Sequence, residues 1–385
     1  MTRRLAGPLV AVAAVLLAAL ALAPVAGAAL TKQERALQNR LERLVATDGG
    51  PPGASVLLQR GKKQKFIRAG VANVDTGAPF KRTDRMRIAS VSKAFSGAVA
   101  MSLVSDGELS LDDTIGEIRP DLPVDWWPVT LRQLLSHTGG VPSFTSDPGF
   151  LQYFGDHLHG DISKLGLIEF VADDDLEFPP GSAYEYSNTD NIVIALMAEQ
   201  ATGRSYGRLL RGLVTGPLDL SRTFLPNDWK LPRPRIEGYD TLPQIDNLTE
   251  CCSMAFVSSS GGIVSTPEEL TRFTRAYVGG ELFGGPVRRE QFSFRAGRSE
   301  PPGPGEMSTG LAMFRYKTRC GAVFGHSGNF PGYTQFTVAT RNGRRGLTFS
   351  VNRQLDLAAP GILAPQAFRV LRKDYGAAVC TLLGR

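Results

Sequence analysis

The chain has 385 residues, of which 42% are hydrophobic and 21% are charged. These fractions are typical of a globular protein, and they exclude a disordered chain, a collagen-like repeat and a long coiled coil. The 43 basic and 37 acidic residues give a net charge of +6. Because no Lys/Arg stripe is interleaved with aromatic residues, we expect no nucleic-acid partner.

The N-terminal segment has the pattern of an export signal. Two arginines near the start precede an uncharged, alanine-rich stretch that runs to Leu30. Ala26 and Ala28 are small residues at the spacing that a signal peptidase recognises. We therefore expect residues 1–28 to be a signal peptide and the protein to be secreted. The sequence alone leaves open whether the signal is cleaved or retained as an anchor, which would be the only membrane contact.

Further along the chain, the pattern of apolar residues predicts strands near both ends and helices between them. Helices are expected after a capping box that starts at Thr31, then at 90–104, 131–136, 162–171, 188–201, 206–213, from 267 onward, and at 366–383. Strands are expected at 54–60, 64–69, 310–316, 320–326, 333–340 and 346–351. This order predicts one sheet built from both chain ends, with a mainly helical insertion.

Ser90-Val91-Ser92-Lys93 lies at the start of the second expected helix. Because residues three apart share a helix face, the Lys93 amine can approach the Ser90 hydroxyl and help to deprotonate it. A serine at the start of a helix also lies at the positive end of the helix dipole, which favours developing oxyanion charge. Ser90 is thus a candidate nucleophile, although the same pattern also occurs in ordinary amphipathic helices.

Tyr186-Ser187-Asn188 is a second candidate element. A phenol near a cationic lysine is expected to ionise more easily and to pass protons. The Asn188 amide offers a donor and an acceptor to a substrate amide. The alternative is a core tyrosine followed by a helix cap, and Tyr184 lacks the asparagine two residues later.

His326-Ser327-Gly328 is the third element, and it lies at the end of an expected strand. A glycine there lets a substrate backbone lie close against the strand. His137 also precedes a glycine by two residues, but it does not lie on a C-terminal strand. For either histidine, the alternative is a residue in a turn.

Together and in this order, the three elements resemble those of the superfamily of serine β-lactamases and penicillin-binding proteins. The closest resemblance is to class C β-lactamases and low-molecular-mass D-alanyl-D-alanine carboxypeptidases (peptidase family S12-like), a group that also contains esterases. In that group the leucine-histidine-glycine stretch around His137 is a structural signature, which argues against a catalytic role for this histidine.

The resemblance implies an α/β (α+β) fold of the β-lactamase/transpeptidase type, in which helices flank an antiparallel sheet. It implies one hydrolase domain over 29–385, with a sheet subdomain at about 29–88 and 266–385. A helical subdomain occupies about 89–265. The oligomeric state is left unknown.

The resemblance also implies site roles: Ser90 becomes acylated, Lys93 and Tyr186 move the proton, and no metal or cofactor is needed. His326 takes the place of a lysine in class C β-lactamases, which weakens the case for β-lactamase activity. Substrate binding is expected to involve Asn188, Ser327, Gly328, the backbone N–H of Asn329 (with that of Ser90, as an oxyanion hole) and Arg315 for a terminal carboxylate.

The implied substrates are small peptides, esters or β-lactams, including peptidoglycan stem peptides. The leading expectation is a D-alanyl-D-alanine carboxypeptidase. A carboxylesterase and a class C-like β-lactamase are the enzymatic alternatives, and a non-catalytic cell-wall or β-lactam-binding protein is the alternative outside enzymes.

The four cysteines allow three pairings. We expect Cys320–Cys380 to form a disulfide that joins a strand to the last helix. Cys251 and Cys252 are then free or form a vicinal pair, and their adjacency is not zinc-ligand spacing.

Overall fold

The computed structural model describes residues 29–240, 245–356 and 364–385, and the expected export signal lies outside them. An eight-stranded sheet has the order β2-β1-β12-β11-β10-β9-β8-β7. Its strands are β1 (Gly53–Arg60), β2 (Lys63–Gly70), β7 (Arg295–Ala296), β8 (Glu306–Thr309), β9 (Phe314–Thr318), β10 (Gly321–Phe330), β11 (Tyr333–Ala339) and β12 (Arg345–Val351). Two-stranded sheets pair β3 (Met86–Arg87) with β6 (Val264–Ser265), and β4 (Tyr239–Asp240) with β5 (Asp246–Asn247).

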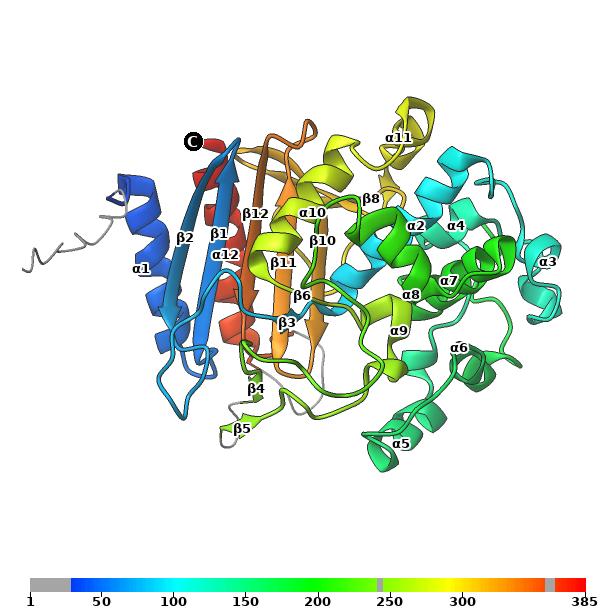
Figure 1. Cartoon of the computed structure of the whole chain (residues 1–385), viewed down its shortest axis with the longest axis horizontal. Helices are drawn as coiled ribbons and strands as arrows, with labels where there is room; N and C mark the ends of the chain where they lie inside the picture. Colours follow the sequence, from blue (N-terminus) through cyan, green and yellow to red (C-terminus); the bar gives the residue numbers. More distant parts are fainter. Residues whose placement is uncertain (1–28, 241–244, 357–363) are drawn as a thin grey trace, which may run out of the picture.

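Helices cover both faces of the large sheet and form a separate region beside it (Figure 1). The helices on the sheet are α1 (Lys32–Ala46), α10 (Pro267–Gly279) and α12 (Pro365–Leu383). The others are α2 (Ser92–Asp106), α3 (Ile115–Ile118), α4 (Leu131–Ser136), α5 (Pro148–Asp156), α6 (Lys164–Ile168), α7 (Asn188–Thr202), α8 (Tyr206–Leu210), α9 (Ser258–Gly261) and α11 (Gly285–Gln291). Among the described residues, no helix has both the length and the apolar character needed to cross a membrane.

The sheet joins the two ends of the chain, as the sequence predicts. β1 pairs antiparallel with β12, with Val56 opposite Phe349, and β2 completes the N-terminal hairpin. Alternate residues of these strands enter two apolar cores. Phe336 stacks on Tyr375 of α12 in one core, and Thr337 on the other face bonds to Thr274 of α10 at 2.8 Å.

One strand begins later than predicted. The sequence predicts a strand over 310–316, whereas β9 begins at Phe314. The preceding residues turn: Ala312 has a φ of 51°, and its N–H donates to the carbonyl of Leu135 in α4 at 2.7 Å. This segment docks on the helical region, because a Cβ added at Gly97 of α2 would lie 2.0 Å from the Cβ of Ala312.

The cysteines are distributed as expected. Cys320, just before β10, is joined to Cys380 of α12 by a disulfide. Cys251 and Cys252 are both free, so the vicinal bond that the sequence left open is not formed. The disulfide therefore ties the last helix to the strand that carries His326.

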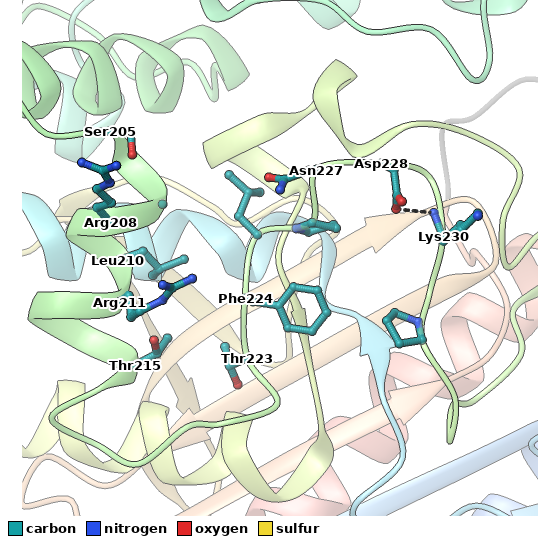
Figure 2. Close-up of a pocket in the computed structure, with 14 residues that line it drawn as sticks. Ser205, Arg208, Leu210, Arg211, Thr215, Thr223, Phe224, Asn227, Asp228 and Lys230 are labelled. Carbon is teal, nitrogen blue, oxygen red and sulfur yellow. Dashed lines mark hydrogen bonds between the residues drawn. The ribbon is translucent and has the colours of Figure 1, made fainter.

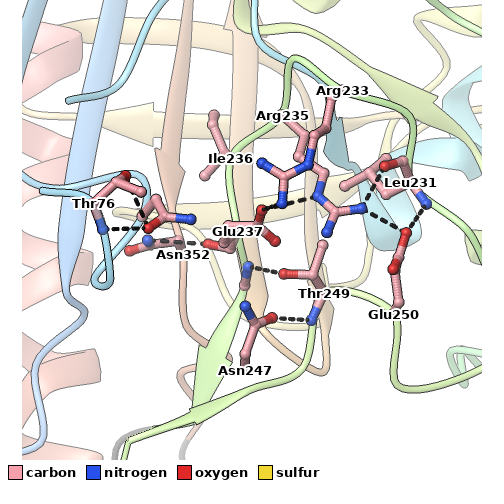
Figure 3. A network of polar contacts seen from close by, with 12 residues as sticks. Thr76, Leu231, Arg233, Arg235, Ile236, Glu237, Asn247, Thr249, Glu250 and Asn352 are labelled. Carbon is pink, nitrogen blue, oxygen red and sulfur yellow. Dashed lines mark hydrogen bonds and ion pairs between the residues drawn. The ribbon is translucent and has the colours of Figure 1, made fainter. Parts of the chain in front are cut away.

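A polar network holds residues 231–240 and 245–250 against the sheet and against β3 (Figure 3). Arg235 contacts Glu237 at 3.0 Å and Glu250 at 2.5 Å, and Asn352 donates to the Glu237 carbonyl at 3.1 Å. The carbonyl of Thr249, within this network, accepts from the guanidinium of Arg87 at 3.1 Å. Because Arg87 ends β3, the network supports the strand that leads into the candidate nucleophile.

Candidate active site

Ser90 lies at the junction between β3 and α2. A short 3₁₀ turn, Ala89–Val91, precedes α2, so Ser90 stands just before the long helix rather than within its first turn. Ala89 has a φ of 51°, a left-handed conformation that is costly for a residue with a Cβ. The amide of Ile88 donates to the carbonyl of Ile263 at 3.1 Å, which anchors the turn. The backbone around Ser90 is thus held in an unusual conformation, as in many active sites.

Lys93 is almost completely buried, with 1% of its surface exposed. Its Nζ lies 3.2 Å from Ser90 Oγ, 2.6 Å from Asn188 Oδ1 and 2.8 Å from the carbonyl oxygen of Ser260. Burial lowers the pKa of Lys93 to about 7, against smaller opposing effects of Glu300 and Asp190. A substantial fraction of the amine is therefore unprotonated at neutral pH.

The three contacts suit a neutral amine. An unprotonated lysine has two N–H groups and one lone pair. The oxygens of Asn188 and Ser260 accept hydrogen bonds from the two N–H groups, because neither oxygen can donate. The lone pair is then left on the side of Ser90 Oγ, 3.2 Å away, to which the protonated amine donates and from which the neutral amine can accept the hydroxyl proton. This geometry makes Lys93 a base for Ser90.

Tyr186 lies beside the lysine, whose Nζ is 4.9 Å from the centre of the ring. The tyrosine hydroxyl is buried and makes no hydrogen bond of normal geometry with a described residue, although the Ser90 side chain is near enough to favour its ionisation. Burial nevertheless raises the pKa of Tyr186 well above its ordinary value. The sequence-based expectation of easier ionisation is therefore wrong in direction, because desolvation outweighs the lowering effect of the Ser90 side chain and the charge of Glu300 adds to it.

His137 packs against Tyr186 with ring centres 4.7 Å apart. Its Nδ1 is 2.7 Å from Oδ2 of Asp190, and both side chains are buried. Burial lowers the pKa of His137 and raises that of Asp190. This structural histidine therefore helps to position the tyrosine ring. The sequence did not predict the contact, because His137 and Tyr186 lie far apart along the chain.

Asn188 begins α7 and has both ends of its amide engaged. Its Oδ1 accepts from Lys93, and its Nδ2 donates to Oγ1 of Thr145 at 2.7 Å. Its backbone N–H donates to Oγ of Ser143 at 3.1 Å. Each amide atom keeps one further hydrogen-bonding position for a substrate. Asn188 is thus first of all the residue that orients the lysine.

The His326 strand lies against the nucleophile turn. A Cβ added at Gly328 would lie 2.6 Å from the carbonyl oxygen of Ile88 and 2.9 Å from the amide nitrogen of Ser90. Only glycine allows this close approach, which places the Asn329 backbone next to that of Ser90. The expected oxyanion hole of these two backbone N–H groups stays a prediction.

The side chains of this strand have separate partners. His326 is buried, with Nδ1 2.5 Å from the Ser327 carbonyl oxygen, and burial lowers its pKa to about 3. It is therefore neutral at physiological pH, unlike the lysine it replaces in the family resemblance. Ser327 donates to the Pro301 carbonyl at 2.5 Å, and Asn329 donates to Asp356 at 3.2 Å.

Arg315 has no demonstrated part in the site. Its guanidinium lies 5.1 Å from the centre of the Phe294 ring. Its neighbour Phe314, on the other face of β9, is the residue that packs against His326, with ring centres 5.0 Å apart. Binding of a substrate carboxylate by Arg315 therefore stays a prediction.

Sequence reasoning missed several groups that the structure brings to the site. No sequence motif could identify the Ser260 carbonyl as part of the site, because every residue has a backbone carbonyl. Ser143 and Thr145 lie in a loop without a recognisable pattern. Glu300 also has no motif, yet its charge raises the pKa of Lys93 and of Tyr186.

A second serine pattern leads to no catalytic site. Ser205, in Gly203-Arg204-Ser205-Tyr206-Gly207, follows helix α7 and directly precedes α8, whereas a nucleophile elbow requires a strand before the serine. It borders a hollow of about 610 Å³ whose lining residues include no histidine (Figure 2). Within the described residues, no group of three or more His, Cys, Asp or Glu is placed to hold a metal ion.

The chain is similar to a known protein family. The family model described as Beta-lactamase matches residues 34–371. The chain is 24% identical over 310 residues to penicillin-binding protein 4* of Bacillus subtilis (strain 168), and the alignment covers 74% of this chain and 65% of that protein. The chain thus spans less than two thirds of the length of this relative.

Two solved structures are similar over most of the chain. The D-stereospecific amidohydrolase from Streptomyces sp. has a TM-score of 0.74 at 27% identity, covering 83% of this chain and 94% of that one. The D-amino acid amidase from Ochrobactrum anthropi SV3, solved with D-phenylalanine, has a TM-score of 0.78 at 22% identity, covering 91% and 100%. The second likeness shows a shared fold.

Proposed function

Because the chain belongs to the beta-lactamase family, within a superfamily of serine hydrolases that includes penicillin-binding proteins, we propose that it is an exported hydrolase that forms an acyl-enzyme on Ser90. The observation that carries this proposal is the buried Lys93, whose Nζ lies 3.2 Å from Ser90 Oγ. Its pKa of about 7 makes it a base at neutral pH.

In the first half of the proposed reaction, Oγ of Ser90 attacks the substrate carbonyl while its proton passes to Lys93. The backbone N–H groups of Ser90 and Asn329 stabilise the negative oxygen of the tetrahedral intermediate. The intermediate then collapses, the carbon–nitrogen or carbon–oxygen bond breaks, and the leaving group takes the proton. The Tyr186 hydroxyl, which burial keeps protonated, relays this proton from Lys93.

In the second half, water attacks the acyl-enzyme. Lys93 accepts a proton from the water, and the ester bond to Ser90 breaks. The oxygen of Ser90 regains a proton and the acid product leaves, so that the site returns to its initial state. No step requires a redox change, and each proton taken up is given back.

The proposed substrates are amides in which the acyl group is a D-amino acid residue. Peptides that end in D-alanyl-D-alanine are the first candidate, as the family resemblance implies. The likeness to a D-stereospecific amidohydrolase at 27% identity favours D-amino acid amides as a second. A carboxylesterase or a β-lactamase would use the same residues, but the neutral His326 supplies no fixed charge for the carboxylate of a β-lactam.

The intact mass of the mature protein tests the proposal. The mature protein is exposed to benzylpenicillin and, separately, to a thioester of a D-alanyl peptide, with Ser90→Ala as the control. We expect a mass increase equal to one acyl group that is lost in the control. If neither compound forms an adduct or is turned over, the peptidase and β-lactamase functions are both excluded.

A further inference from the structure

The loop between β7 and β8, residues 297–305, is attached to the active site on both sides. The hydroxyl of Tyr184 donates to the carbonyl oxygen of Arg298. On the other side, Ser327 donates to the carbonyl oxygen of Pro301 at 2.5 Å. Tyr184 precedes Tyr186 by two residues and Ser327 follows His326, so Glu300 lies between two attachments to the segments that carry site residues.

The Glu300 carboxylate is available to bind a ligand, because no described residue pairs with it. Its side chain is exposed, and within the described residues it forms no ion pair or hydrogen bond. Its charge nevertheless acts on the catalytic groups, because it raises the pKa of Lys93, Tyr186 and Tyr184. Glu300 is therefore open to solvent and within electrostatic reach of the reacting atoms.

The charges around Glu300 favour a cationic ligand. Partial burial is the main cause that raises the pKa of Glu300; among the charged neighbours, Arg298 lowers it, Glu185 and Asp356 raise it, and Lys93 lowers it. Arg298 is not within ion-pair distance of Glu300, and Lys93 is uncharged for part of the time at neutral pH. A terminal carboxylate entering here would meet more negative than positive charge, whereas an ammonium group would be attracted.

A second, independent observation shows that a ligand belongs at this place. The Tyr186 side chain is 8% exposed, and its hydroxyl lacks a hydrogen-bond partner among the described residues. A buried hydroxyl without a partner is costly, and at an active site the missing partner is commonly the substrate. The unpartnered Tyr186 hydroxyl thus lies within the electrostatic reach of Glu300, whose charge raises its pKa.

We propose that Glu300 binds the protonated amino group of the substrate, so that the enzyme prefers amides and peptides whose D-amino acid residue has a free α-amine. This inference rests on the proposed function and favours the second of its substrate classes, the D-amino acid amides, over longer peptides that end in D-alanyl-D-alanine, in which the amino group of the penultimate residue is acylated. It makes Glu300 a specificity-determining residue. An N-acylated substrate has no ammonium group, so its neutral amide would leave the carboxylate without a charged partner.

The test compares hydrolysis of D-alanine p-nitroanilide with that of its N-acetyl derivative at pH 7, where an α-amine is mostly protonated. We expect the native protein to favour the free amine by about tenfold or more in kcat/KM, as for a charge-assisted contact. Glu300→Gln should remove most of this preference, mainly through a higher KM. Glu306→Gln, which changes an exposed carboxylate paired with Lys317, is the matched control and should keep the preference.

Acylation by benzylpenicillin, followed by intact mass in the same proteins, distinguishes failure of this inference from failure of the proposed function. If Ser90 is acylated but the native protein does not favour the free amine, or if Glu300→Gln keeps the preference, the inference is overturned and the proposed function stands. If no compound acylates Ser90, the proposed function fails and the inference fails with it.

Discussion

The proton-transfer group (Ser90, Lys93, Tyr186 and Asn188) and the Glu300 loop lie side by side but are built in opposite ways. In the first, the Lys93 amine has three protein partners at 3.2 Å or less and almost no solvent contact. In the second, an exposed carboxylate has no ion-pair partner within the described chain. The contacts of the Lys93 amine are complete without a ligand, whereas the Glu300 carboxylate awaits one. We therefore assign proton transfer to the buried group and the choice of substrate to the Glu300 loop.

Replacing the buried Lys93 is expected to have the largest effect on the rate of acylation. Lys93→Met keeps an unbranched side chain but removes the base, so we expect kcat for acylation to fall by about 10³- to 10⁴-fold. Lys317→Met, on the exposed surface of β9, should leave the rate unchanged. Single-turnover acylation measured by stopped flow checks this. A fall of less than tenfold would mean that another group deprotonates Ser90.

The tyrosine is expected to matter less than the lysine. Tyr186→Phe removes the hydroxyl that relays the proton but keeps the ring that packs on His137, so we expect a loss of about 10² in kcat. The loss should be larger for an anilide than for an activated ester, because only the amine leaving group needs a proton. Equal losses for both substrates would contradict the relay.

Loss of the Cys320–Cys380 disulfide is expected to lower stability without changing catalysis. Replacing Cys320 and Cys380 together by serine opens a bridge across a separation of 60 residues, and we expect the free energy of unfolding to fall by about 2–4 kcal/mol. The kcat of the folded fraction should be unchanged, because the site contacts do not involve the bridge. Urea unfolding with parallel activity measurements tests this. Lost activity at unchanged stability would place the bridge in the site.

The smallest effect links the two regions. The negative charge of Glu300 raises the pKa of Lys93, so Glu300→Gln should lower it. Because activity requires the unprotonated amine, the acidic limb of the kcat/KM profile should move to lower pH by a few tenths of a unit to one unit. Measuring the N-acetyl substrate avoids titration of the substrate amine. A shift to higher pH would contradict the assigned interaction.

The sequence predicted the contact between Ser90 and Lys93 but not the groups around it, and for a physical reason. Ser90 and Lys93 lie three residues apart, so local geometry alone brings them together. Apolar patterns likewise predicted a sheet shared by both chain ends. The contact of His137 with Tyr186 and the approach of Glu300 to Lys93 depend on tertiary packing between distant segments. Desolvation also reversed the expected direction for Tyr186, because burial is a property of the fold.

The measurement that tests the central claim most directly is the pH dependence of Ser90 acylation in a single turnover, followed by intact mass from pH 5 to pH 9. If Lys93 is the base, the rate of adduct formation should rise with pH, with a midpoint of about 7, and then level off. Ser90→Ala should form no adduct at any pH. A rate that is constant across this range, or that still rises steeply at pH 9, would contradict the assignment of an unprotonated Lys93 as the base.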